Sequence, residues 1–95
     1  MEEELLIAEL HYEPHYSEVH DQLVQFIRQH YPDVQSGLQG DSWIWVFQGS
    51  MKVAVDTFSA MKHQVKCLPE SVELAEQLID CLSTRYQVNR LNGAE

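Results

Sequence analysis

One stretch decides the fold of this chain: residues 42–56, which read SWIWVFQGSMKVAVD. Aromatic and β-branched residues fill its first half, and Val53 and Val55 alternate with polar or small residues in its second half, which indicates two strands. Gly49 and Ser50 separate them, and glycine at the first central position suits a two-residue type II′ turn. This hairpin predicts Val46 opposite Val53 and Ile44 opposite Val55.

Working outward, residues 5–12 and residues 63–67 each carry alternating apolar positions and predict two further strands. Pro14 ends the first of them. Residues 33–40 hold two glycines among mostly polar residues and predict a loop.

Two segments carry apolar side chains at helical spacing. Residues 18–30 predict a helix with Ser17 as its N-cap, ending before Pro32. Pro69 and Ser71 open the second helix, whose apolar stripe runs to Tyr86.

The resulting order, β-α-β-β-β-α, predicts an α+β two-layer sandwich: a four-stranded, mostly antiparallel sheet with two helices packed on one face. A crossover helix predicts that residues 5–12 run parallel to residues 42–48. We expect the strands to lie in chain order, because placing the first strand last would leave the Trp-rich strand at an exposed edge. Residues 1–88 would form one compact domain and residues 89–95 a flexible C-terminal tail.

The charge balance limits the possible partners. The chain has 95 residues and a formal net charge of −9, from 15 acidic and 6 basic side chains. The helix-meander-helix portion resembles the arrangement of double-stranded-RNA-binding domains, which place lysines near the start of the second helix. Residues 69–73 read PESVE here and would repel phosphate, so we expect no nucleic-acid partner.

The apolar runs of the chain are short. The longest, residues 43–47, cannot span a bilayer, and residues 1–8 lack the basic region of a secretory signal. We therefore expect a cytoplasmic protein with no membrane contact. Cys67 and Cys81 lie far apart in the sequence and are expected to be reduced packing residues.

No catalytic motif is present. Neither a nucleophile elbow nor a phosphate loop occurs, and a pair such as His63 and Cys67 on one strand is more typical of packing than of catalysis. Residues 11–20 contain His11, His15 and His20, and imidazoles beside carboxylates bind divalent metals. Their spacing matches no recurrent motif, so the leading interpretation has no metal and no other cofactor. A divalent-metal protein using these three histidines is the alternative function.

Residues 42–67 carry a resemblance. Their Trp-containing strand runs through Phe47-Gln48-Gly49-Ser50 into two more strands, and this stretch resembles a small bacterial family of unknown function with chains about as long as this one. The resemblance implies a single compact α+β domain and neither an activity nor site residues.

The two-residue hairpin also assigns side chains to faces, with Ile44, Val46, Val53 and Val55 under the helices. The opposite face would carry Ile7, Trp43, Trp45, Phe47, Lys52, Ala54 and Asp56. A Trp-rich apolar centre with a polar rim is typical of a protein interface. We therefore expect a small non-catalytic protein-interaction or assembly module, as a homodimer or in complex with another protein. A three-residue turn would reverse the faces and bury the tryptophans, and a third possibility is an acidic regulator of a basic partner.

Overall fold

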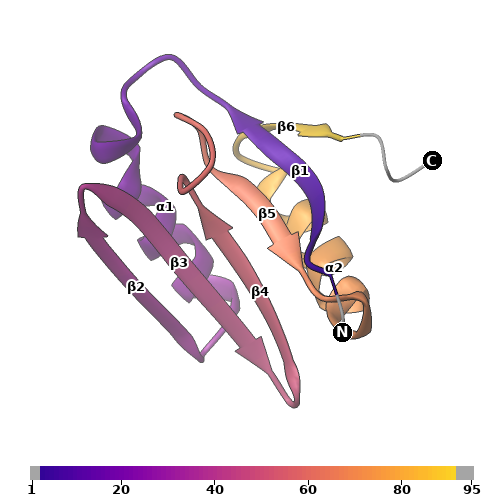
Figure 1. Ribbon diagram of the computed structural model, residues 1–95. Coiled ribbons are helices and arrows are strands. Elements are labelled where there is room, and N and C mark those ends of the chain that lie inside the picture. The colour runs from indigo at the N-terminus through magenta and orange to yellow at the C-terminus, as the bar shows by residue number, and fades with distance from the viewer. Residues whose placement is uncertain (1–2, 92–95) are drawn as a thin grey trace.

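The computed structural model describes residues 3–91, which form one antiparallel sheet with both helices on the same face (Figure 1). The elements in chain order are β1 (Leu5–His11), α1 (Tyr16–His30), β2 (Val34–Gln39), β3 (Asp41–Gln48), β4 (Met51–Asp56), β5 (Gln64–Cys67), the short 3₁₀ helix η1 (Pro69–Ser71), α2 (Val72–Leu82) and β6 (Gln87–Arg90). No helix within this described part is long and apolar enough to cross a membrane.

The expected four-stranded sheet is wrong, although the α+β class is right. The sheet has six strands in the order β2-β3-β4-β5-β1-β6, and every neighbouring pair is antiparallel. β1 does not lie beside β3 as expected but between β5 and β6. The chain order was expected because it kept the Trp-rich strand away from an exposed edge of the sheet. In the structure β2 pairs with β3 along its whole length and protects that edge instead.

Both additional strands come from segments that were expected to be irregular. β2 replaces the expected loop over residues 33–40, and Gly40, with φ +87°, allows the chain to reverse at once into β3. β6 includes Asn89 and Arg90, which were expected in the flexible tail. The Leu91 backbone N–H donates to the Ile7 carbonyl at 2.9 Å, and residues 92–95 lie outside the described residues.

The β3–β4 hairpin has the predicted register. Gln48 pairs with Met51 around the two-residue turn, Val46 lies opposite Val53, and Ile44 lies opposite Val55. Gly49 has φ +62°, and no non-glycine residue among those described has a positive φ, as a type II′ turn requires.

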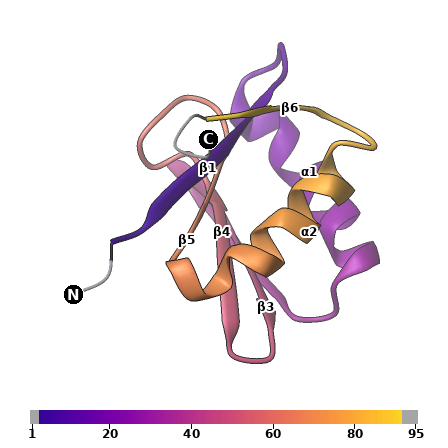
Figure 2. The same cartoon turned by 90° about the vertical axis from the view of Figure 1, so that its right-hand side faces the viewer.

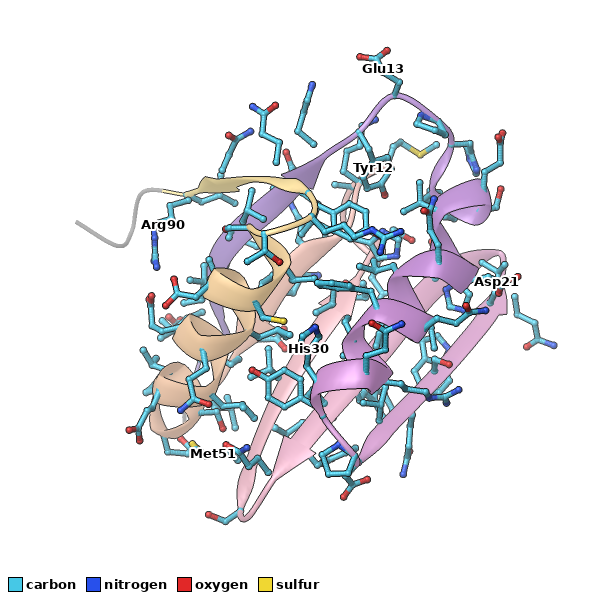
Figure 3. The ribbon with its side chains drawn as sticks, turned by 180° about the vertical axis from the view of Figure 1, so that it is seen from behind. Tyr12, Glu13, Asp21, His30, Met51 and Arg90 are labelled. Atoms are coloured by element: carbon cyan, nitrogen blue, oxygen red, sulfur yellow. The ribbon has the colours of Figure 1, made fainter. Side chains whose placement is uncertain are left out.

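The two helices cover one face of the sheet (Figures 2 and 3). α1 begins two residues earlier than expected, because His15 rather than Ser17 is the N-cap: its Nδ1 accepts a hydrogen bond from the Ser17 backbone N–H at 3.1 Å. The sheet and the helices share one hydrophobic core, whose largest fully buried members include Leu10, Leu23, Ile27, Ile44, Leu74, Leu78 and Leu82.

Candidate functional site: the open sheet face

The sheet face turned away from both helices, called here the open face, is the candidate site. Strand register places on it Gln35 and Gly37 of β2, Trp43, Trp45 and Phe47 of β3, Lys52, Ala54 and Asp56 of β4, Gln64 and Lys66 of β5, and Leu6, Glu9 and His11 of β1. The helix-facing residues of the hairpin, such as Ile44 and Val53, are completely buried. The predicted separation of the two hairpin faces is therefore confirmed.

Trp43, Trp45 and Phe47 form what we call the aromatic shelf. The Trp43 and Trp45 ring centroids are 4.5 Å apart with the planes inclined by 40°, and the Lys52 ammonium lies 4.0 Å from the centre of the Trp45 ring. Trp43 lies directly over Gly37, where a Cβ atom would come within 2.5 Å of its indole. Gly37 thus makes room for Trp43 to lie flat on the sheet.

The residues expected on this face differ in their exposure. The three shelf side chains are half-buried, and Lys52 is exposed. Ala54 and Asp56 are buried, so they support the face without offering contact area of their own.

Ile7 does not lie on the open face as expected. A bulge between Leu6 and Ala8 shifts the register of β1 against β5, and Ile7 is buried as a member of the hydrophobic core. Leu6 takes the open-face position opposite Lys66 instead and is 42% exposed. Strict alternation along β1 could not predict this exchange, because the extra residue of a bulge inverts the faces on one side of it.

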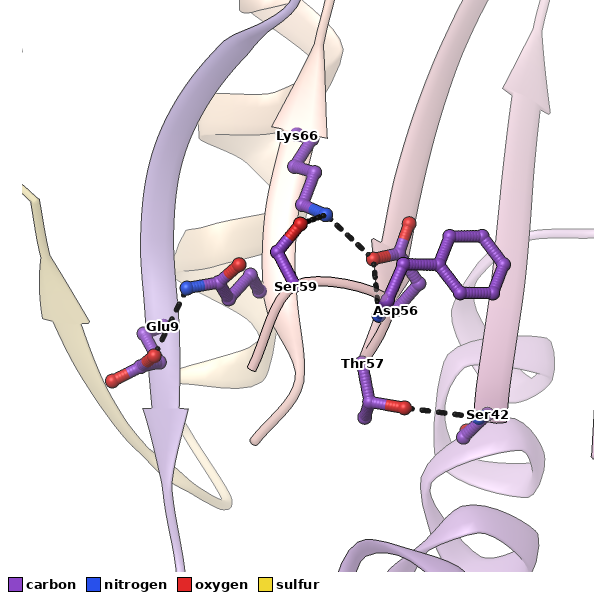
Figure 4. A network of polar contacts seen from close by, with 8 residues as sticks. Glu9, Ser42, Asp56, Thr57, Ser59 and Lys66 are labelled. Carbon is purple, nitrogen blue, oxygen red and sulfur yellow. Dashed lines mark hydrogen bonds and ion pairs between the residues drawn. The ribbon is translucent and has the colours of Figure 1, made fainter. Parts of the chain in front are cut away.

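Asp56 and Lys66 form a buried ion pair at the centre of the open face (Figure 4). The Lys66 ammonium lies 2.8 Å from Asp56 Oδ1, and the side chains are only 10% and 4% exposed. The same Oδ1 accepts a hydrogen bond from the Phe58 backbone N–H at 3.2 Å. This bond ties the loop after β4 to the face, and the loop offers two apolar side chains that the sequence analysis missed, Phe58 (54% exposed) and Met61 (63% exposed).

A hollow of about 300 Å³ adjoins the aromatic shelf. It is lined by Glu4, Ser50, Lys52, Ala54, Lys66, Cys67, Leu68, Glu70 and Ser71. Three of these residues belong to the open face, so the shelf and the hollow form one continuous surface. The hollow is large enough to receive a single side chain of a partner.

The three histidines of the alternative metal site are not brought together. His11 is exposed on the open face, and His15 is the exposed N-cap of α1. His20 is buried, and its Nδ1 lies 2.5 Å from Ser42 Oγ. Within residues 3–91, no group of three or more His, Cys, Asp or Glu side chains has an arrangement that could hold a metal ion.

A buried chain of polar groups joins Tyr12, His63, Ser42 and His20. The Tyr12 hydroxyl is 2.8 Å from His63 Nδ1, His63 Nε2 is 2.6 Å from Ser42 Oγ, and Ser42 Oγ contacts His20. Burial lowers the pKa of His63 to about 4, with a smaller contribution from His20. Burial also lowers the pKa of His20, opposed by the charge of Asp21. Both imidazoles are therefore neutral at pH 7.

The protons of this network can be placed so that every hydrogen bond in it has one donor and one acceptor. Burial raises the pKa of Tyr12 to about 12, so its hydroxyl keeps its proton at pH 7. In one such placement the hydroxyl donates to His63 Nδ1. His63 then donates from Nε2 to Ser42, and Ser42 donates to His20. The reverse order of donors satisfies the same contacts. Ser42 and His63 are completely buried, so a substrate carbonyl cannot reach the serine oxygen. The network fastens β1, α1, β3 and the start of β5 together.

The two cysteines have the structural character expected of them. Both are free, Cys67 is buried, and Cys81 is half-buried. Burial raises the pKa of each thiol, which keeps both protonated at pH 7. The ring nitrogens of His63 are bonded to Tyr12 and Ser42, so neither is available to activate Cys67.

Comparison of the chain with protein-family models, curated proteins and solved structures found no match. The resemblance of residues 42–67 to a small bacterial family therefore remains an expectation.

Proposed function

We propose that this chain is a small non-catalytic protein-interaction module and that the open face is its contact surface for a partner protein. The observation that carries the proposal is the aromatic shelf: two tryptophans in mutual contact and a phenylalanine are partly exposed on the side of the sheet that no helix covers. Tryptophan is among the residues most enriched at the energetic centres of protein interfaces.

The surroundings of the shelf match the layout of an interface. Exposed Lys52, Gln35 and Asp41 lie around it, so an apolar centre has a polar rim. Gly37 below Trp43 and the ammonium beside Trp45 hold the two indoles in place before binding. Side chains that are already ordered lose less conformational entropy when a partner binds, which favours affinity.

The partner that this surface suits is a protein with an exposed apolar patch and polar groups around it. The free cysteines are typical of a reducing compartment, which supports a cytoplasmic location for the complex. The metal-binding alternative has no geometric support, because His20 is bonded to Ser42 and His11 and His15 lie on separate elements.

The test is affinity capture from the native host with three forms of the tagged chain: wild type, Trp45→Glu and Gln25→Glu. Gln25 is exposed on α1, on the opposite side of the molecule, so Gln25→Glu is the matched control for the added charge. We expect wild type and Gln25→Glu to retain the same discrete partner. Trp45→Glu should raise the dissociation constant for that partner about thirtyfold or more, as loss of an interface hot spot does.

The variant must stay folded for this comparison, and the structure predicts that it does, because Trp45 is partly exposed and lies outside the hydrophobic core. Far-UV circular dichroism checks this point. Phe47→Glu, which affects the same shelf, provides a second variant. Equal recovery of the partner by wild type and by both folded shelf variants would overturn the proposal.

A further inference from the structure

We infer that β2 is a second, separate interface, through which two copies of this chain pair edge to edge. The two β2 strands would run antiparallel about a two-fold axis at Ser36 and join two sheets into one of twelve strands. β2 is the outermost strand on its side, with no described element beyond it (Figure 1). This inference does not depend on the proposed function of the open face.

The hydrogen-bond pattern shows which groups of β2 are available. The Phe47 N–H donates to the Asp33 carbonyl at 3.0 Å, and hydrogen-bonded pairs alternate along an antiparallel ladder. Gln35 and Gly37 therefore direct their backbone groups toward β3. Ser36 and Leu38 direct theirs outward, as does Val34, whose carbonyl accepts a long 3.4 Å bond from Arg28.

Apart from the Arg28 guanidinium at the Val34 carbonyl, β2 lacks the usual features that protect an edge strand from pairing. Its six residues, VQSGLQ, include no charged side chain and no proline, and its register with β3 has no bulge. The opposite edge, β6, is shorter, and Arg90 on it forms an ion pair with Glu76 of α2. Of the two edges, β2 is the one suited to receive another strand.

The sequence of β2 is self-complementary about Ser36. In a two-fold pairing centred there, Ser36 lies opposite the partner's Ser36, and Val34 lies opposite the partner's Leu38. The apolar residues therefore meet each other, and the three outward-directed residues of each strand bond across the axis. Leu38, which is 41% exposed in the single chain, gains an apolar neighbour.

Charge favours this edge over the helical side for self-association. The chain carries a net charge of −9, and the exposed surfaces of α1 and α2 include Glu18, Asp21, Glu73 and Asp80. Two copies meeting through the helices would bring these carboxylates together, whereas β2 has no charged side chain and the Arg28 group bonded to its Val34 carbonyl is a cation. A second copy is thus the occupant that fits the β2 edge.

Such a dimer places the two open faces on the same side of one sheet. The two β2 strands would lie between β3 and the partner's β3, which would be about 14 Å apart. A six-residue edge forms a small interface, so the dimer should dissociate at concentrations on the order of micromolar.

The experiment measures mass and amide exchange on the whole chain as a function of concentration. The mass measured by light scattering should rise from 11.0 kDa in dilute solution to twice that value in concentrated solution. Hydrogen exchange should be slow at Gln35 and Gly37 at every concentration, and slow at Ser36 and Leu38 only in the dimer. A mass of 11.0 kDa at the highest attainable concentration would overturn the inference, as would a dimer in which Ser36 and Leu38 exchange as in the monomer.

A pair of lysine variants tests the register. Ser36→Lys would place two ammonium groups opposite each other at the axis and should raise the dissociation constant about tenfold or more. Gln39→Lys, on the same strand, would lie opposite the partner's Asp33 and should leave dimerisation intact. If Ser36→Lys fails to fold, Ser36→Pro replaces it in the test. Proline at this position removes the outward-directed backbone N–H that would bond to the partner's Ser36. Equal dimerisation of wild type and the folded Ser36 variant would contradict the proposed axis, and all these results are independent of Trp45.

Discussion

Lowering the pH should destabilise this fold well above the range in which most carboxylates titrate, because His63 stays neutral inside it. The side chain is completely buried, and burial lowers its pKa from 6.5 to about 4. The unfolded chain therefore binds a proton between these values that the folded chain does not, so the free energy of unfolding falls as the pH falls. Between these two pKa values, each pH unit lowers the free energy of unfolding by about 1.4 kcal/mol. The loss of this free energy between pH 7 and pH 4.5 comes to about 2 kcal/mol. The lowered pKa of His20 acts in the same direction.

The assay is urea denaturation followed by circular dichroism at several pH values between 7 and 4.5. His63→Gln removes the titrating group while its amide can still donate to Ser42, so this variant should start less stable but show a flatter pH profile. His30→Gln is the matched control, because His30 is exposed on α1 and the variant should keep the wild-type profile. Comparing the three profiles separates His63 from the carboxylates that all of them share.

Two results would refute this reasoning. The first is a His63→Gln profile parallel to that of wild type over this pH range. The second is a His63 ring that titrates near 6.5 when followed by NMR in the folded protein. Either would show that the imidazole is not held neutral by burial.

Three further changes test the open face and the hairpin by their effect on the free energy of unfolding. Gly37→Ala should cost about 1–3 kcal/mol and shift the tryptophan fluorescence, because its methyl group would displace the Trp43 indole; an unchanged spectrum would contradict the packing described here. Lys66→Met should cost about 3–5 kcal/mol, since it leaves Asp56 buried without its partner; a loss below about 1 kcal/mol would show that water reaches the pair. Gly49→Ala should cost about 1–2 kcal/mol because of its φ of +62°, and an unaffected midpoint of urea denaturation would argue against the type II′ turn.

The local chemistry of the sequence was sufficient to predict the hairpin and both helices. Gly49-Ser50 fixed the register of β3 against β4, and that register placed Trp45 and Val46 on opposite faces. Spacing of apolar residues located the start of α1 to within two residues and its end before Pro32. The second helix is shorter than expected, because Pro69–Ser71 form a 3₁₀ turn and α2 ends at Leu82 rather than near Tyr86. These features depend on neighbours in the chain, which is why the sequence alone reveals them.

The features that the sequence did not reveal depend on partners far away in the chain. β2 contains glycine and polar residues, and its strand conformation comes from pairing with β3. The bulge that moves Ile7 into the core arises from the pairing of β1 with β5, which the expected strand order did not include. Ser42, His63 and His20 meet only when three separate elements pack together, and no spacing in the sequence marks them as a group.

The most direct test of the central proposal, that the open face docks a partner protein, is photo-crosslinking inside the native host. A photo-reactive amino acid is placed at Lys52, which is exposed beside the aromatic shelf, and in a separate strain at Gln25 on the helical side. The proposal predicts one discrete crosslinked protein from position 52, lost when Trp45→Glu is added, and no such product from position 25. A discrete product from position 25 with none from position 52 would contradict it.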